Sequence, residues 1–304
     1  MITVLSGGTG TPKLLQGLKS VYDPSKINII VNTLENDYFS GVYVTPDIDT
    51  VLYTMSDMIN DDLWYGVKGD TFITHDRLNE LGSFELLKIG DIDRSTKIQK
   101  TLLMENHTLS EAVNIQSNSM DIKSKIIPMS NEDSYVKIET NIGDVDFHDF
   151  LIKHKGELDV LNVKFSNVSP SPDVISTIEE SDGVIIGPSN PITSILPIIS
   201  MKGVKKALKN NYVVAISPFI GRKPISGPAK KFMNALGYET SSLGVSEIYN
   251  DFLDVLYIDN RDFEMKNDLE KIINDVYIDN ICFKNLNDKK DLSQKILNKI
   301  FKRD

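Results

Sequence analysis

The sequence of 304 residues has few of the residues on which several protein classes depend. Its single cysteine, Cys282, excludes an intrachain disulfide and a zinc site built on several cysteines. No hydrophobic run approaches the roughly 20 residues that a membrane-spanning helix needs. Basic residues are outnumbered, 33 against 43 acidic ones, and the net charge is −10. We therefore expect neither a membrane nor a nucleic-acid partner.

The start of the chain and its cysteine content bear on localisation. The chain opens with the strand-like run Ile2–Leu5 rather than with a basic leader and a long apolar stretch. A nearly cysteine-free chain also suits a reducing compartment. We expect a cytoplasmic protein.

The remaining composition is that of an ordinary globular protein, with 40% hydrophobic and 25% charged residues. Short β-branched runs alternate with helical patterns, which predicts an α/β fold with a mostly parallel sheet. The two runs at 135–140 and 145–152 flank a turn and predict a hairpin. The expected strands are Ile2–Leu5, Ile27–Asn32, Tyr135–Thr140, Val145–Ile152, Leu161–Phe165, Gly183–Ile186, Tyr212–Ile216 and Val255–Ile258.

Residues 58–119 differ from the rest because their leucines follow helical spacing and no strand pattern occurs among them. Leu78, Leu81, Leu86 and Leu87 all fit such a pattern. We predict a helical insertion over 58–119, and a core formed by 1–57 and 120–304. A helix is expected to begin at Pro46 after Thr45, and another to close the chain over 291–301.

A glycine-rich loop follows the first expected strand and precedes a helix. Its glycines should let the backbone approach an anion, tolerate positive φ and lead into the positive end of a helix. The loop lacks the lysine of a phosphate-binding Walker motif and the third glycine of a dinucleotide motif. A tight structural turn is the alternative. The expected nucleotide- or phosphate-binding residues here are Gly7, Gly8, Thr9, Gly10 and Thr11.

Two further loops follow expected strands at the same edge of the sheet. In the loop 187–191, Ser189 and Asn190 are predicted to bind the nucleotide or its phosphates. Asn190 could instead only cap a helix that starts at Pro191. The loop 221–228 has two basic residues, Arg222 and Lys223, and is equally compatible with a plain surface loop.

Acidic residues without basic neighbours mark the segment 27–67, which has seven acids and no lysine or arginine. This pattern favours a divalent cation held by carboxylates. On a helix, Asp49, Tyr53 and Asp57 would share one face, and we predict Asp49 and Asp57 as metal ligands. Stabilisation of the helix dipole by the first-turn acids, among them Asp47, is the alternative.

These segments together resemble the family of 2-phospho-L-lactate transferases. The likeness runs from residue 2 to about residue 260. The glycine loop alone is shared with gluconeogenesis-factor-like proteins, so a non-catalytic nucleotide- or nucleotide-sugar-binding regulator is the alternative function. The segments that favour the transferase are Pro46–Tyr53 and Trp64–Phe72, supported by Val31–Thr33, Lys88–Asp91, Gly187–Ile195 and Ser226–Ala229.

The resemblance implies an enzyme that transfers a phospholactyl group from lactyl-2-diphospho-5′-guanosine to the deazaflavin Fo (7,8-didemethyl-8-hydroxy-5-deazariboflavin). The products are GMP and the coenzyme F420 core without glutamate. It further implies Mg²⁺ as cofactor, a homodimer, and a Rossmann-like sheet with a helical insertion. The donor could carry lactate, phosphoenolpyruvate or another small acid.

By motif position, the family's deazaflavin-binding acid and lysine fall on Asp49 and Lys88. Asp49 is also the expected catalytic residue. It could bind the metal, or it could orient and deprotonate the attacking hydroxyl. Both roles stay open at this point.

Overall fold

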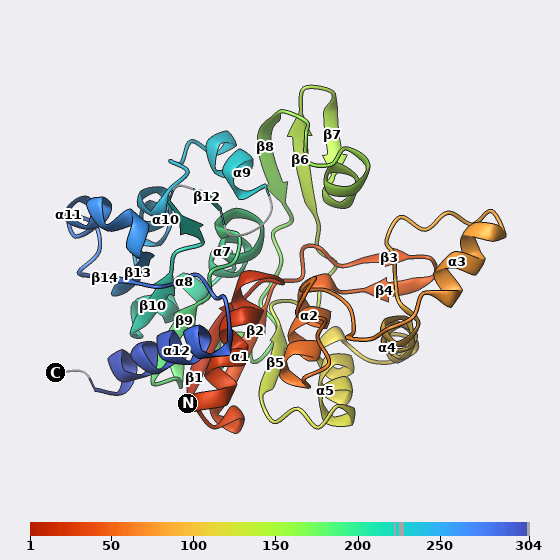
Figure 1. Ribbon diagram of the computed structural model, residues 1–304, viewed down its shortest axis with the longest axis horizontal. Helices are drawn as coiled ribbons and strands as arrows, with labels where there is room; N and C mark the ends of the chain where they lie inside the picture. The colour runs from red at the N-terminus through yellow and green to blue at the C-terminus, as the bar shows by residue number, and fades with distance from the viewer. Residues whose placement is uncertain (222, 225–227, 303–304) are drawn as a thin grey trace.

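Seven parallel strands form the central sheet of the computed structural model, which describes all residues except 222, 225–227, 303 and 304 (Figure 1). Their order across the sheet is β14-β13-β10-β9-β1-β2-β5. Taken along the chain, the first six strands have the Rossmann order 3-2-1-4-5-6, and β14 extends the edge beside β13. The predicted Rossmann-like α/β fold is confirmed. The strands are β1 (Ile2–Ser6), β2 (Ile27–Val31), β5 (Lys125–Pro128), β9 (Gly183–Ile186), β10 (Val213–Ile216), β13 (Val255–Asp259) and β14 (Asp275–Asp279).

Helices cover both faces of this sheet, because successive side chains of a strand point to opposite sides. Val4 packs in one buried cluster with Leu14 and Ile296. Its neighbour Leu5 packs in the opposite cluster with Leu208. The first layer contains α1 (Gly10–Val21), α2 (Pro46–Met55), α5 (Leu109–Ser119) and α12 (Leu286–Phe301). The second contains α6 (Val174–Glu179), α7 (Leu196–Ser200), α8 (Val204–Lys209), α9 (Ala229–Ala235) and α10 (Ser242–Tyr249).

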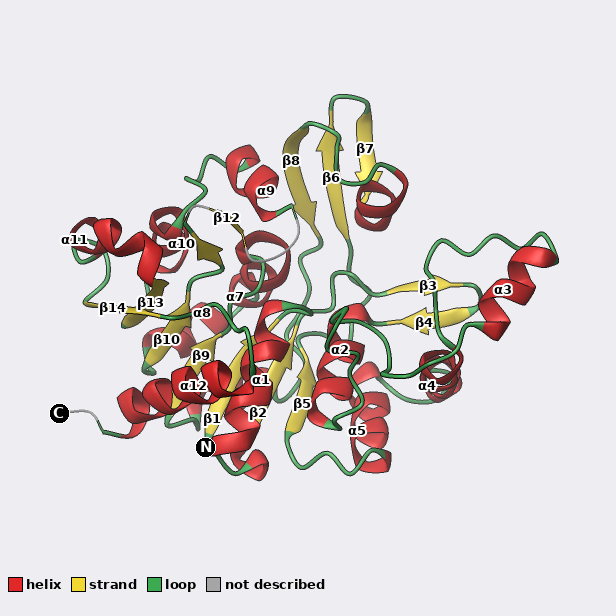
Figure 2. Ribbon diagram, viewed as in Figure 1, coloured by secondary structure: helices red, strands yellow, loops and turns green. Residues whose placement is uncertain are grey.

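A projecting arm extends from the first layer (Figure 2). It combines a small antiparallel hairpin, β3 (Asp37–Phe39) and β4 (Val42–Val44), with helices α3 (Ile73–Glu80) and α4 (Asp91–Leu103). A separate buried cluster joins the hairpin to Ile89. Residues 58–119, all of them described, contain three helices and no strand beyond an isolated bridge between Ile59 and Val67. However, the hairpin precedes this range, and α5 packs on the central sheet.

The helical pattern predicted through Leu86 and Leu87 is wrong. Helix α3 ends at Glu80, and a turn at Gly82 has a φ of 81° that few other residues adopt. Leu86 and Leu87 then lie in irregular backbone and pack against the hairpin cluster. These two leucines are therefore spaced for packing against the hairpin and do not indicate a helix.

A second, smaller sheet stands above the central one at the top of Figure 1. It is antiparallel, with the order β7-β6-β8, and contains β6 (Val136–Thr140), β7 (Gly143–Asp146) and β8 (Val160–Phe165). The predicted hairpin is confirmed, although its second strand ends at Asp146. A π-helical turn, η2 (Asp149–Lys153), follows and buries Phe150 against Phe232. The run 161–165, expected as a strand, belongs to this antiparallel sheet, with Leu161 exposed.

The remaining short elements connect these layers: η1 (Pro24–Lys26), η3 (Pro191–Ile195), β11 (Phe219–Ile220), β12 (Lys223–Pro224), η4 (Asn260–Met265) and α11 (Lys266–Leu269). Among the described residues, none of the helices combines the length and apolar character needed to cross a membrane.

Candidate functional site

Two loops meet at the carboxyl edge of the central sheet, where β1 and β9 lie side by side. The backbone N–H of Gly7 donates to Ser189 Oγ at 3.0 Å, and the hydroxyls of Thr11 and Ser189 are 2.7 Å apart. Gly10 packs directly on the carbonyl of Pro188, so that a side chain at this position would collide with the second loop. This is the edge at which Rossmann-like sheets bind ligands, between strands whose connections leave in opposite directions.

A small pocket of about 140 Å³, here called the loop pocket, opens at this junction. Four of the seven residues predicted to bind the nucleotide line it: Gly8, Thr9, Ser189 and Asn190. Gly7, Gly10 and Thr11 instead hold the two loops together. The side chain of Asn190 also caps η3 by accepting from the backbone N–H of Ile192 and Thr193.

The glycines are required for close packing and not for positive φ, which corrects that part of the prediction. Positive φ does not occur at Gly7, Gly8 or Gly10. Gly8 lies against the Asp47 carboxylate, which any Cβ at Gly8 would displace. The backbone N–H of Gly8 also donates to this carboxylate, as does Asn32 Nδ2 at 2.9 Å.

Asp47 and Glu35 place two acidic groups in the loop pocket. Burial raises the pKa of Asp47 to about 7, against the bonds from Asn32 and Gly8. Burial, and then the charge of Asp47, also raises the pKa of Glu35. Among the described residues, no lysine or arginine forms an ion pair with either acid. In the part of the chain that the structure describes, this pair therefore has no basic partner, and a bound cation would favour its ionised form.

The two predicted metal ligands, by contrast, do not come together. Helix α2 ends at Met55, and Asp57 lies beyond it with a φ of 62° and a side chain 82% exposed. Asp57 pairs at 2.7 Å with Lys19, whose ammonium also binds the backbone carbonyl of Thr54 at the end of α2. The expected shared face of Asp49 and Asp57 is therefore wrong.

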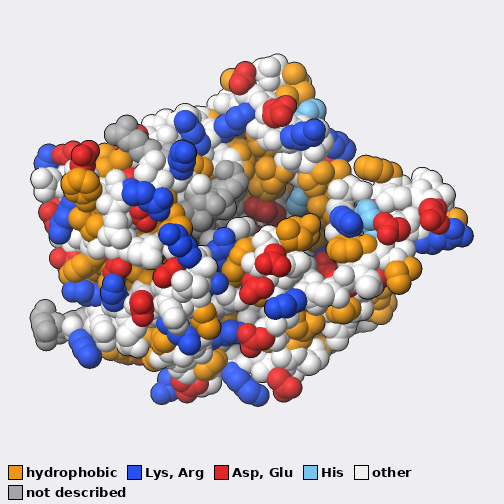
Figure 3. Space-filling model, in the orientation of Figure 1, with side chains coloured by type: hydrophobic (Ala, Val, Ile, Leu, Met, Phe, Trp, Pro, Cys, Tyr) orange, Lys and Arg blue, Asp and Glu red, His pale blue; other side chains and the backbone are white. Residues whose placement is uncertain are grey.

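A larger pocket of about 420 Å³, here called the arm pocket, lies between α2, the arm and η2. Figure 3 shows the corresponding hollow below the upper sheet, with hydrophobic side chains on its wall and acidic atoms deep inside. Both residues assigned to the deazaflavin by resemblance, Asp49 and Lys88, line this pocket. Its apolar lining includes Val44, Tyr65, Leu86, Leu87, Ile89, Leu151 and Ile152.

Asp49 lies at the floor of the arm pocket and is saturated with donors. Its carboxylate accepts from the Thr45 hydroxyl at 2.9 Å and pairs with Lys97 at 3.2 Å and with Lys100. Burial opposes ionisation, but the charges of Lys100 and Lys97 bring the pKa of Asp49 down to about 2. Such a group is a weak proton acceptor near neutral pH. Its two lysine partners also leave it a poor ligand for Mg²⁺, so the geometry favours a positioning role.

Lys88 has a different environment. Its ammonium lies 4.3 Å from the centroid of the Phe72 ring, and it forms no ion pair with an acid in the described part of the chain. The side chain is exposed at the mouth of the arm pocket. It can therefore reach a ligand at little desolvation cost.

The two pockets are neighbours, since Glu35 and Leu151 line both. His148, just before η2, holds this junction together. Its Nε2 lies 2.8 Å from the carbonyl oxygen of Glu35, and its ring packs edge-on against Phe39 at 4.8 Å. The upper sheet, the arm and the loop pocket therefore meet at Glu35.

Three residues that line the arm pocket, Glu35, Lys97 and His148, were not predicted from the sequence, and neither was Lys100, which pairs with Asp49 beneath the pocket. For the lysines a signal was present in α4. Asp93, Lys97 and Lys100 repeat at helical spacing and are buried, whereas Ile98 and Leu102 on the same helix are exposed. This inversion of the usual pattern indicates a buried charged cluster. The loop 221–228 cannot be compared in full, because Arg222, Ser226 and Gly227 lie outside the described residues.

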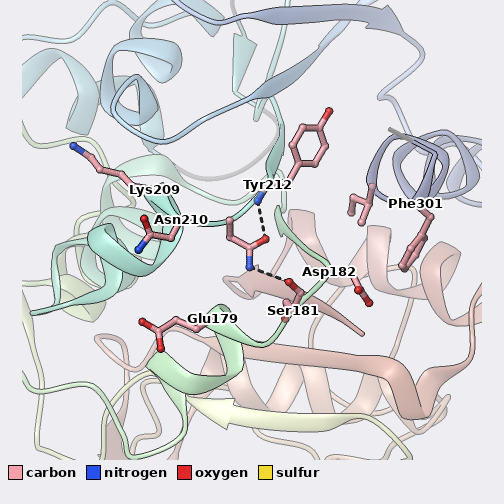
Figure 4. Close-up of a pocket in the computed structure, with 9 residues that line it drawn as sticks. Glu179, Ser181, Asp182, Lys209, Asn210, Tyr212 and Phe301 are labelled. Atoms are coloured by element: carbon pink, nitrogen blue, oxygen red, sulfur yellow. Dashed lines mark hydrogen bonds between the residues drawn. The ribbon is translucent and has the colours of Figure 1, made fainter. Parts of the chain in front are cut away.

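Another hollow, of about 740 Å³, is at the opposite edge of the sheet (Figure 4). Its polar groups bond one another: Asn211 donates to the carbonyl of Ser181 and accepts from the backbone N–H of Tyr212. It lies at the amino ends of the strands, away from the loops. We do not assign the site to it.

Comparison with known proteins agrees with the geometry. A profile of the 2-phospho-L-lactate transferase CofD family matches residues 2–296. The 2-phospho-L-lactate transferase of Methanothermobacter thermautotrophicus is 57% identical over 99% of this chain and 98% of its own. That of Methanocaldococcus jannaschii is 48% identical over 98% and 97%, and that of Methanococcoides burtonii 44% over 97% of each.

Among solved structures, a UPF0052-family protein from Bacillus halodurans has the same fold. The TM-score is 0.64 at 17% identity, over 97% of this chain and 98% of that one. This likeness concerns the fold alone. The sequence relatives decide between the two functions considered above, in favour of the enzyme. A match over nearly the whole chain, with relatives of such identity, shows that the protein belongs to the CofD family of 2-phospho-L-lactate transferases and is a transferase.

Proposed function

We propose that the protein acts in coenzyme F420 biosynthesis and transfers the 2-phospholactyl group from lactyl-2-diphospho-5′-guanosine to Fo. A hydroxyl oxygen of Fo forms a bond to the phosphorus that carries lactate. The bond from this phosphorus to the oxygen of GMP breaks, GMP leaves with the electron pair, and the hydroxyl proton is released. Family membership supports this reaction.

The loop pocket would hold the diphosphate of the donor. The pocket is lined by Gly8 and Thr9, and Thr9 makes no side-chain cap on α1. The N-terminus of α1 would therefore favour an anion, through its helix dipole and the N–H groups of its first turn. Phosphoryl transfer depends mainly on such positioning and on charge neutralisation.

The arm pocket would hold the deazaflavin ring. Its volume of about 420 Å³ and its largely apolar lining suit a flat aromatic ligand. Tyr65 offers an aromatic surface, and Lys88 and the floor around Asp49 offer polar groups for the edges of the ring.

Mg²⁺ is the proposed cofactor, and Asp47 and Glu35 fit it better than Asp49 and Asp57. Neither carboxylate forms an ion pair with a described lysine or arginine, and both lie in the pocket proposed for the diphosphate. One or two carboxylates together with phosphate oxygens are a usual ligand set for Mg²⁺. The described residues contain no cluster of three or more His, Cys, Asp or Glu, as a cage made by protein alone would need. Bound Mg²⁺ would neutralise charge on the diphosphate and on the leaving GMP.

One observation carries the proposal: the two pockets share Glu35 and Leu151. A diphosphate in one pocket and an aromatic ring in the other would bring the side chain of the ring beside the phosphates. A non-catalytic regulator would have no need of the second pocket.

The test is turnover by the purified full chain with Fo, Mg²⁺ and the lactate donor, with the phosphoenolpyruvate donor in a parallel arm. We expect GMP and phosphorylated deazaflavin to appear in equal amounts, faster with the lactate donor. Tight nucleotide binding without GMP release in the presence of Fo would contradict the transferase. Faster turnover with phosphoenolpyruvate would keep the reaction but change the donor.

A homodimer is also part of the proposal, and the arm supplies its interface. Apolar side chains are exposed along the arm, with Phe84 85% and Ile73 73% accessible. Ile98 and Leu102 face outward one turn apart on α4. Exposed apolar surface of this kind is typical of association sites. Light scattering should give the mass of two chains for the wild type and of one chain for Phe84→Asp. A monomeric wild type would exclude the dimer.

A further inference from the structure

A buried charged cluster forms the floor of the arm pocket. Asp49 and Asp93 alternate with Lys97 and Lys100, so that two negative and two positive groups lie together. The Tyr53 hydroxyl closes the cluster by donating to Asp93 at 2.6 Å. Each of the two lysines contacts Asp49, and Lys97 also pairs with Asp93.

The two lysines differ in what else they face. Lys100 is fully buried and binds the hydroxyl of Thr45 in addition to Asp49. Lys97 lines the arm pocket, as do Asp49 and Asp93. Only Lys97 of the two can therefore contact a ligand in that pocket.

A count of hydrogen-bond donors shows that Lys97 has one to spare. An ammonium carries three N–H groups. Among the described residues, Lys97 has two acceptors, Asp93 and the Asp49 oxygen at 3.2 Å. The ring of Tyr53, 5.8 Å away, attracts the charge but accepts no ordinary hydrogen bond. The third N–H can serve a ligand.

The walls of the arm pocket above Lys97 are apolar, so a polar atom of a ligand depends on a donor at the floor for its hydrogen bond. Leu86, Leu87 and Ile89 line the pocket from the arm, and Leu151 and Ile152 line it from η2. A heteroaromatic ligand that buries a carbonyl or a ring nitrogen here needs a hydrogen-bond donor at the floor. Asp49 and Asp93 are ionised partners of lysines and offer only acceptors.

We propose that Lys97 is a further acceptor-binding residue, which donates a hydrogen bond to a carbonyl oxygen or ring nitrogen of the heteroaromatic acceptor. Asp49 acts through it by fixing the ammonium with one carboxylate oxygen. This inference rests on the proposed function, because it requires an aromatic acceptor in the arm pocket. The contact from Lys97 is additional to the contact between Asp49 and the deazaflavin that the resemblance implies.

The chain offers a matched pair of variants. Lys97→Gln and Lys100→Gln each remove one of the two lysines that neutralise Asp49, and both should lower the melting temperature. Only Lys97→Gln should weaken deazaflavin binding, by about tenfold or more in Kd, as expected for a lost charge-assisted hydrogen bond. The Kd for GDP should change less than about twofold in both variants. Titration of Fo fluorescence and calorimetry with GDP supply these values.

A measurement on the wild type covers the case in which Lys97→Gln does not fold. Fo labelled with ¹³C at its carbonyls and ¹⁵N at its ring nitrogens should show one carbonyl or ring-nitrogen resonance moved on binding, as a hydrogen bond from an ammonium produces. Equal loss of Fo affinity in both glutamine variants, no loss in Lys97→Gln, or no movement of any of these resonances would each overturn the inference alone. A wild type that binds no Fo would overturn the proposed function and this inference with it.

Discussion

Lys97 Nζ lies 3.2 Å from Asp49 Oδ2, and this ion pair joins the first turn of α2 to the middle of α4. Both side chains are nearly inaccessible to solvent and both line the arm pocket. The pair fixes the arm on the core and at the same time forms part of the floor on which a ligand would lie. Substitutions at Asp49 should therefore affect stability and activity together.

Asp49→Asn should lower turnover about 100-fold, because the acceptor would lose the polar floor that orients it. It should also lower the free energy of unfolding by about 3 kcal/mol, since Lys97 and Lys100 would then share a site without a full counterion. Steady-state kinetics and urea unfolding measure the two effects. Asp62→Asn, at an exposed aspartate, is the control and should change neither. Wild-type turnover by Asp49→Asn would remove Asp49 from the site.

The low pKa of Asp49 predicts a dependence of stability on pH. Its pKa is about 2 in the folded protein, below the ordinary value of 3.8, because Lys100 and Lys97 outweigh burial. The resulting stabilisation is present above about pH 4 and is lost as the pH falls through 2. It amounts to about 2 kcal/mol, of which about 1 kcal/mol is gone at pH 3.

Urea unfolding of the wild type and Asp49→Asn at pH 5 and pH 3 isolates this contribution. The difference in free energy between the two proteins should shrink at pH 3. A constant difference would show that Asp49 is not held in its ionised form by the two lysines.

Gly8→Ala should weaken binding of GDP while the protein stays folded, because a Cβ at this position displaces the Asp47 carboxylate from the loop pocket. We expect a loss of about tenfold in affinity, roughly that of one charge-assisted hydrogen bond. Calorimetry measures it, with a thermal melt to establish folding. In an Asp47→Ala background the same change should cost less. An equal loss of GDP affinity in both backgrounds would show that the effect of Gly8→Ala does not act through Asp47.

Lys88→Ala should raise the KM for Fo more than the KM for the donor, because Lys88 lines the arm pocket and not the loop pocket. The rise should be about tenfold if the ammonium binds a polar edge of the ring. Initial rates with each substrate varied separately give both constants. Lys68→Ala, at an exposed lysine outside both pockets, is the matched control. Unchanged constants in Lys88→Ala would make Lys88 a surface residue.

Five of the seven parallel strands and the two loops could be predicted from local sequence, since these strands are short buried runs and glycine directly follows β1 and β9. Strands β5 and β14 were not predicted. Of the upper sheet, only the hairpin of β6 and β7 could be predicted, because a run such as 160–165 has the same residues whether its partner is parallel or antiparallel. The order of the strands in the sheet could not be predicted from hydrophobic periodicity either. It was expected only because the resemblance implies a Rossmann-like sheet.

Within the site, the acids of 27–67 were visible but their counterions were not. The absence of nearby lysines favoured a metal at Asp49, whereas its cations come from α4, about fifty residues further along the chain. The counterion of Asp57 comes from α1, Lys19. Separation along the sequence carries no information on such contacts. Only the tertiary fold shows that, among the described residues, Asp47 and Glu35 are the neighbouring buried acids without a basic partner.

The arrangement of the two pockets is tested most directly by a crystal structure of the protein with GDP, Mg²⁺ and Fo bound. Our account predicts the diphosphate against Gly8 and Thr9, and the deazaflavin ring between Tyr65 and Leu86, with its hydroxylated side chain directed toward Glu35. Fo bound outside the arm pocket, for example in the hollow beside Tyr212, would contradict it.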